Sequence, residues 1–166
     1  MRMLYRFMMI LSGLSMVLAF LSVLLGIVAR EARWDIPGLD AYAGYAIAAT
    51  LFLALPSTLI HGDHIRVTLL SNRFKGTAAR NLESFVLLTA CLLSAAVAFF
   101  SCRLVWVSYT THDMSPAADA SALWVPQMAM ALGCIGFAIA FCDALVSHLR
   151  NKPFFINVPG DIARVE

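Results

Sequence analysis

Charged residues are scarce in this sequence, and long parts of it contain none. Only 13% of the 166 residues are charged while 61% are hydrophobic, whereas a soluble domain is roughly a quarter charged and half apolar. Four stretches are free of charge: residues 7–29, 41–60, 84–102 and 120–142. Each is long enough for a helix to cross a hydrocarbon core of roughly 30 Å. The scarcity of charge argues against an ordinary soluble domain and indicates an integral membrane protein.

The uncharged stretches predict the fold class, an all-α membrane protein. Only helices and closed barrels satisfy backbone polar groups in lipid, and these stretches are too long and too continuously apolar for barrel strands. We expect four transmembrane helices, at about residues 7–29, 41–60, 84–106 and 121–146. The chain is predicted to form one integral membrane domain over residues 1–166.

The motifs of most enzymes and of self-sufficient transporters are also missing. The sequence has no phosphate-binding loop and no glycine-rich dinucleotide motif, and its serine, histidine and acidic residues are too scattered for a hydrolase. The middles of the four stretches hold no ionisable side chain, whereas a protein that moves a charged substrate by itself usually needs one there. We therefore predict neither an enzyme nor a transporter that works alone, and no cofactor in this chain.

The four cysteines form no Cys-x-x-Cys pair. They are Cys91, Cys102, Cys134 and Cys142, and all fall within predicted helices. We interpret them as small packing residues rather than as a disulfide framework or a metal site.

Lysine and arginine are distributed unequally between the two ends of the predicted helices. One side holds nine of them: Arg2, Arg6, Arg66, Arg73, Lys75, Arg80, Arg150, Lys152 and Arg164. The other side holds three: Arg30, Arg33 and Arg103. Because cytoplasmic loops carry the excess of Lys and Arg, both termini and the loop between the second and third helices are predicted to be cytoplasmic. Trp34, Trp106 and Trp124 then fall at outer helix ends, where indole rings favour the membrane interface.

A short polar segment separates the second and third predicted helices. In this segment Ile65, Leu69 and Leu70 recur near helical spacing, with Arg66 and Arg73 interleaved among the neighbouring positions. The pattern predicts a short amphipathic helix that lies in the inner interface of the membrane.

Six residues are candidates for contacts with lipid or with a partner protein. Three lie at the inner interface, namely His64, Arg66 and Arg73, and three at the outer side, namely Arg30, Arg33 and Trp34. Arg66 suits either a lipid phosphate or a carboxylate of a partner subunit, and both readings stay open. A nucleic-acid partner is not expected, because cations beside lipid head groups need none.

The histidines raise the question of a metal or a haem. His61 and His64 are three residues apart with Asp63 between them, but a zinc site requires four ligands, so we interpret them as an interfacial polar cluster. Haem would need histidines that face each other inside the bundle, whereas His148 also lies at the inner boundary and His112 in an outer loop. A haem-binding membrane anchor of a respiratory complex is kept as the alternative function.

Small residues recur four positions apart on several predicted helices. The sets are Ser22/Gly26, Ser94/Ala98/Cys102, Ala129/Gly133 and Gly136/Ala140/Ala144. This spacing lets helix backbones approach closely in lipid. The sequence leaves open whether these faces pack within the chain or against another membrane protein.

Two motifs resemble those of a known family. The first is Gly62-Asp63-His64-Ile65-Arg66-Val67-Thr68-Leu69-Leu70, and the second is Ser121-Ala122-Leu123-Trp124-Val125-Pro126, followed by Gly133 and Gly136. They are similar to the Gly-x-His-Ile-x-Val-Asp-Leu-Leu stretch and to the entry of the last helix in the DctQ-like small membrane subunit (Q subunit) of tripartite ATP-independent periplasmic (TRAP) transporters. The resemblance covers essentially the whole chain, although Thr68 stands where the family often has Asp.

The resemblance implies an accessory small permease subunit of a sodium-coupled secondary transporter that imports an organic acid. It implies two protein partners, a large multi-spanning membrane subunit and a soluble periplasmic substrate-binding protein. Sodium coupling is expected in the large subunit, which this chain would scaffold. The implied location is the bacterial inner membrane, with several passes.

Overall fold

The computed structural model describes residues 2–34, 36–61, 77–117 and 120–150 of the chain. It contains four long helices: α1 (Arg2–Glu31), α2 (Leu39–His61), α4 (Thr77–Thr110) and α5 (Trp124–Leu149). All four are long and apolar enough to cross a membrane, so the predicted all-α class with four transmembrane helices is confirmed. The amphipathic segment predicted between the second and third helices lies outside the described residues.

The third and fourth transmembrane helices differ from their predicted bounds. α4 runs from Thr77 to Thr110 and so extends beyond the predicted span 84–106 at both ends. α5 begins at Trp124 instead of residue 121. The backbone N–H groups of Ser115 and Leu123 bond to the carbonyls of Ser121 and Asp113 across the preceding loop, at 2.7 Å and 3.1 Å, and this pairing keeps residues 121–123 out of the helix.

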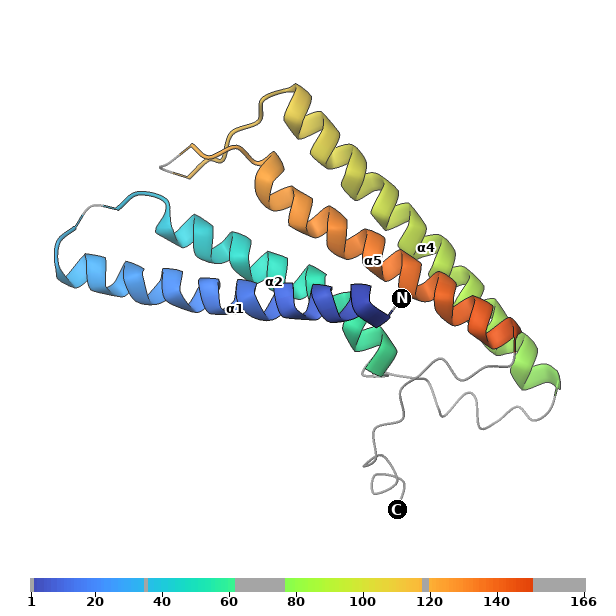
Figure 1. Cartoon of the computed structure of the whole chain (residues 1–166). Helices are drawn as coiled ribbons and strands as arrows, with labels where there is room; N and C mark the ends of the chain where they lie inside the picture. The colour runs from blue at the N-terminus through green and yellow to red at the C-terminus, as the bar shows by residue number, and fades with distance from the viewer. Residues whose placement is uncertain (1, 35, 62–76, 118–119, 151–166) are drawn as a thin grey trace, which may run out of the picture.

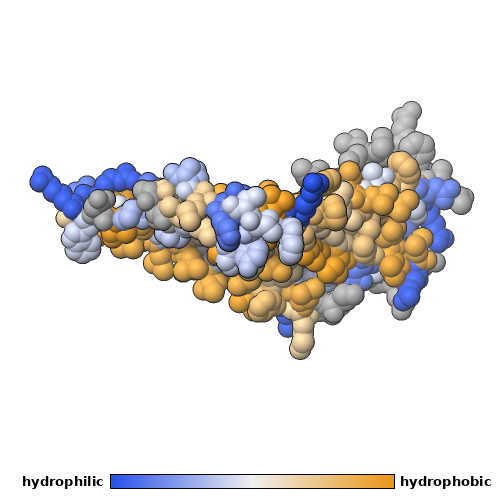
Figure 2. Space-filling model, turned by 90° about the horizontal axis from the view of Figure 1, so that it is seen from above, coloured by the Kyte–Doolittle hydropathy of each residue, from blue (hydrophilic) through white to orange (hydrophobic). Residues whose placement is uncertain are grey.

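The helices form two antiparallel hairpins, α1–α2 and α4–α5, which meet through α2 and α5 (Figure 1). The spatial order is therefore α1–α2–α5–α4, with α1 and α4 at the edges. The edge helices α1 and α4 spread apart toward the α1–α2 turn and the α4–α5 loop (Figure 1). Figure 2 shows a broad apolar surface, with hydrophilic residues at both ends of the view and in a group near its middle. An apolar surface of this kind is expected where helices face lipid.

The seam between the hairpins is a close approach of two backbones. Pro56 of α2 has no N–H to offer the carbonyl of Phe52 one turn earlier. Gly133 of α5 lies directly against that carbonyl, and a Cβ on Gly133 would stand 2.4 Å from the Phe52 oxygen. Gly136 instead meets the side chains of Met8 and Pro56. The seam therefore needs glycine most at Gly133, where the neighbouring atoms belong to the backbone.

The small-residue face of α5 packs within the chain. Gly133, Gly136, Ala140 and Ala144 are all buried in the isolated chain. On α4 the corresponding face is buried at Ser94 and Ala98, whereas Cys102 is exposed. The question that the sequence left open is thus answered for α5: its stripe joins the two hairpins.

The seam inside the α4–α5 hairpin uses side chains instead of bare backbone. Ser101 Oγ lies 3.5 Å from Cys134 Sγ, and Cys91 Sγ lies 3.1 Å from Cys142 Sγ. Cys91 and Cys134 thus pack between helices, as interpreted from the sequence for all four cysteines, whereas Cys102 and Cys142 are exposed. The four cysteines are free thiols in this structure.

Candidate partner-binding surfaces

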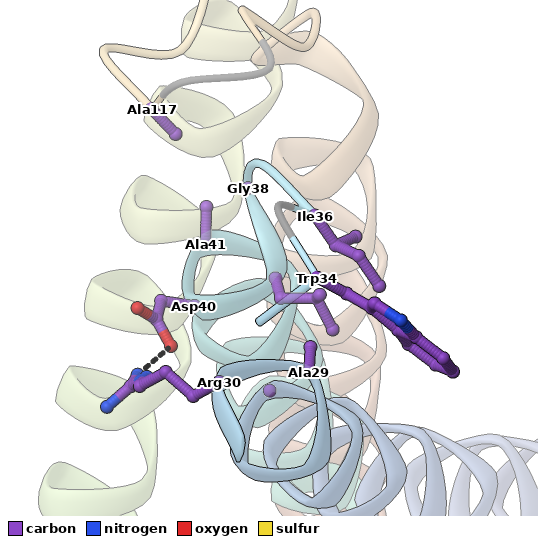
Figure 3. A pocket seen from close by; sticks show the side chains of 10 residues that line it. Ala29, Arg30, Trp34, Ile36, Gly38, Asp40, Ala41 and Ala117 are labelled. Carbon is purple, nitrogen blue, oxygen red and sulfur yellow. Dashed lines mark ion pairs between the residues drawn. The ribbon is translucent and has the colours of Figure 1, made fainter. Parts of the chain in front are cut away.

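A cavity of about 390 Å³ opens at the α1–α2 turn (Figure 3). We call this end of the molecule the outer end, and the opposite end the inner end, after the orientation predicted from the sequence. Its lining residues are Gly26, Ala29, Arg30, Trp34, Ile36, Gly38, Leu39, Asp40, Ala41 and Ala117. Arg30 Nη2 lies 3.7 Å from Asp40 Oδ1, with side chains 77% and 91% exposed. A pair this exposed is screened by water and contributes little to stability. Its groups are therefore available to another molecule.

The turn that shapes this cavity carries a strained residue. Trp34 N–H donates to the Ala29 carbonyl at 2.8 Å and Arg33 N–H to the Arg30 carbonyl at 3.3 Å. These two bonds form a Schellman motif, in which the αL position is usually glycine. Here that position is Arg33, with a φ of 55°. A non-glycine residue in this region is uncommon, and such strain is often found at functional positions.

The six predicted contact residues divide into two groups. Arg30 and Trp34 line the outer cavity, and the exposed Arg33 belongs to the same turn without lining the cavity. His64, Arg66 and Arg73 lie outside the described residues. Asp40 and Ala117 were missed by the sequence reasoning; the opposite charge of Asp40, just after a short turn that follows Arg30, was the available signal.

The loop between α4 and α5 reaches over to α2 at this outer end. Tyr45 Oη and Ser115 Oγ are 2.6 Å apart, and Ala117 contributes to the wall of the outer cavity. The loop is itself paired through one antiparallel bridge, between Met114 and Ala122. The outer surface is therefore built jointly by both hairpins.

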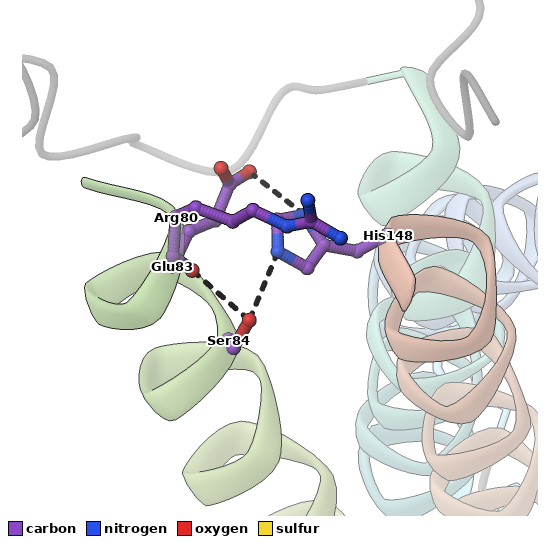
Figure 4. Close-up of polar contacts among 4 residues, drawn as sticks. All are labelled: Arg80, Glu83, Ser84 and His148. Carbon is purple, nitrogen blue, oxygen red and sulfur yellow. Dashed lines mark hydrogen bonds and ion pairs between the residues drawn. The ribbon is translucent and has the colours of Figure 1, made fainter. Parts of the chain in front are cut away.

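At the inner end, polar groups connect α4 with α5 (Figure 4). Ser84 Oγ donates to the Arg80 carbonyl at 2.9 Å, which uses its only hydrogen. It therefore accepts from His148 Nε2 at 3.0 Å. The other ring nitrogen, Nδ1, lies 3.8 Å from Glu83 Oε1. Since Glu83 is exposed, this second contact is the weaker one.

The remaining inner-end groups also serve contacts within the chain. Tyr5 Oη lies 3.5 Å from Asp143 Oδ2 and links α1 to α5. His61 Nδ1 lies 2.7 Å from the Ser57 carbonyl of its own helix. Among the residues that the structure describes, no three His, Cys, Asp or Glu side chains are grouped to hold a metal ion.

Four long apolar helices, with no charged side chain in residues 7–29, 41–60, 84–102 or 120–142, define a small multi-pass membrane protein. A family profile described as the DctQ component of tripartite ATP-independent periplasmic transporters matches residues 4–151. The chain therefore belongs to the DctQ family: it is a small component of a TRAP transporter in the inner membrane, and not an enzyme. No curated protein matches the chain. The resemblance seen in the sequence is confirmed.

Proposed function

We propose that the chain is the accessory small permease subunit of a sodium-coupled TRAP transporter that imports an organic acid. The observation that carries this proposal is the absence of charged side chains from residues 7–29, 41–60, 84–102 and 120–142, which make up most of the four helices. A carboxylate solute and a sodium ion both need polar partners within the membrane. The binding and coupling steps therefore belong to the large subunit, and this chain serves as its scaffold.

The packing of the helices supports a scaffold role. Backbone contact at Gly133 leaves no room for the seam between the hairpins to slide. The inner end is held by contacts of Asp143 with α1 and of His148 with α4. A subunit joined at these points can hold a moving partner in place.

The outer cavity is proposed as a contact site for the periplasmic binding protein. Arg30 and Trp34 lie at its edge, and Trp34 is 62% exposed. Arg33 keeps its charge at a position where glycine would cost less backbone energy. This assignment places α1–α2 turn residues outside, which agrees with the excess of Lys and Arg on the opposite side.

At the inner interface, His64, Arg66 and Arg73 are proposed to bind lipid head groups or the large subunit. Both termini would then lie in the cytoplasm. Loss of the Arg66 charge, in Arg66→Ala, should lower recovery of the large subunit if Arg66 pairs with a carboxylate there. Unchanged recovery would assign Arg66 to lipid phosphate.

Reconstitution of the subunits into liposomes tests the proposed function. We expect uptake of a labelled organic acid only when this chain, the large subunit, the binding protein and an inward sodium gradient are all present. The matched controls omit one component at a time. Uptake by this chain alone, or full uptake by the large subunit without it, would refute the proposal.

A further inference from the structure

The two edge helices have different exposed faces. Between Arg6 and Arg30, every exposed residue of α1 is apolar, as expected for a surface against lipid chains. The outer half of α4 instead exposes Arg103 together with Phe99 and Trp106. α1 and α4 both lie at an edge of the bundle, but α1 exposes a uniformly apolar face whereas α4 exposes a cation between aromatic rings.

Arg103 lies toward the end of α4 that leads into the α4–α5 loop. α4 continues to Thr110, so at 1.5 Å per residue Arg103 stands about 10 Å inside the helix end and about 30 Å from Glu83 at the inner end. Further out along α4, Tyr109 packs edge-on against Trp124, with ring centroids 5.7 Å apart. Because aromatic residues of this kind mark the membrane interface, the backbone of Arg103 lies on the hydrocarbon side of Tyr109.

This cation has no partner within the described part of the chain: Arg103 makes no hydrogen bond or ion pair there. Its guanidinium stays charged and offers five donors, which a carboxylate of a partner protein, like water or a lipid phosphate, can accept. Phe99 and Trp106 stand one turn to either side of it on the same helix face and are 65% and 69% exposed. Arginine flanked by exposed aromatic rings is typical of the residues that dominate protein interfaces.

We propose that the α4 face formed by Phe99, Arg103 and Trp106 binds the large membrane subunit, with Arg103 paired to a carboxylate of that subunit. The inference rests on the proposed function, because it requires the large subunit as the occupant. The unpaired positive charge selects a partner surface that offers an acidic side chain at the outer membrane boundary. The apolar face of α1 then faces lipid.

Copurification of the large subunit with the tagged chain in mild detergent tests this pairing. Arg103→Gln should lower the recovered large subunit about tenfold, and Arg103→Lys, which keeps the charge, should retain most of it. Arg6→Gln removes an exposed cation from α1 and should leave recovery unchanged. Equal helix content and yield of all variants, measured by circular dichroism, exclude a folding defect.

Photocrosslinking tests the same surface without removing the charge. A benzoylphenylalanine in place of Phe99 should crosslink to the large subunit, whereas the same group in place of Phe20 on α1, which is 62% exposed, should not. If Arg103→Gln leaves recovery intact and position 99 gives no crosslink, the inference is wrong and Arg103 binds lipid phosphate. If the unaltered chain recovers no large subunit, the proposed function fails as well.

Discussion

The two seams of α5 show two ways of holding helices together in lipid. Against α2, α5 presents glycines, so that Gly133 touches the backbone at Phe52. Against α4, it presents groups that meet side chains, such as Cys134 opposite Ser101 and His148 opposite Ser84. Lipid tails are as apolar as leucine, so neither seam gains from excluding water. Close backbone packing stabilises the first seam and polar side-chain contacts stabilise the second. The two seams should therefore respond differently to substitution.

The largest expected effect is at the backbone seam. A Cβ in Gly133→Ala would stand 2.4 Å from the oxygen and 2.5 Å from the carbonyl carbon of Phe52, and neither atom can move aside without shifting α2. We expect a loss of about 3 kcal/mol in the free energy of unfolding, measured by denaturation in detergent micelles. Gly44→Ala is the matched control, because a Cβ there meets nothing within 4 Å. If the two variants were equally stable, the close backbone contact at Gly133 would not be what distinguishes this seam.

Gly136→Ala should have a smaller effect on the same seam. Its Cβ would meet chiefly the end of the flexible Met8 side chain, at 2.5 Å, which can turn away. We expect a loss of about 1 kcal/mol. The double variant Met8→Ala/Gly136→Ala removes most of the Met8 side chain and should recover part of that loss. Fully additive losses of stability from the two substitutions would contradict this account.

The polar seam, which is the contact between α4 and α5, should contribute a smaller free energy than the backbone seam. That free energy should depend on both partners of each hydrogen bond. In a double-mutant cycle of Ser84→Ala and His148→Ala, we expect a coupling of about 0.6 kcal/mol, typical of hydrogen bonds between membrane helices. Ser22→Ala is the control, since Ser22 Oγ bonds only to the Leu18 carbonyl of its own helix. A coupling near zero would mean that backbone packing holds the α4–α5 hairpin as well.

The thiol contact checks the register of the polar seam with little effect on stability. With Cys102 and Cys134 replaced by alanine, mild oxidation should join Cys91 and Cys142, whose sulfur atoms are 3.1 Å apart. Thiol labelling with a maleimide after denaturation should then fall from two sites to none. Persistent labelling of both thiols would show that the two helices are displaced from this register.

The sequence predicted the elements better than their contacts. The uncharged runs located all four helices, but α4 extends beyond its predicted span at both ends, because charged residues such as Arg80 and Glu83 fit a helix nearly as well as leucine does. Leu123 was assigned to the last helix because its hydrogen bond to the Asp113 carbonyl cannot be predicted from hydropathy. Arg30 and Trp34, which the sequence predicts as contact residues, line the outer cavity. Asp40 was not among the predicted residues, because its pairing with Arg30 depends on the turn between them.

Sequence alone determined that this chain crosses a membrane four times and resembles a TRAP small subunit. The physical reason is that lipid cannot satisfy backbone polar groups, so length and absence of charge are enough to specify helices. Only the tertiary structure decided the order α1–α2–α5–α4, because faces of nearly equal hydropathy are distinguished by shape alone. The shape that matters most is local: Pro56 leaves the Phe52 carbonyl without its helical donor, and Gly133 lets α5 reach it. The same arrangement leaves Arg103 facing outward, toward the subunit that we propose it binds.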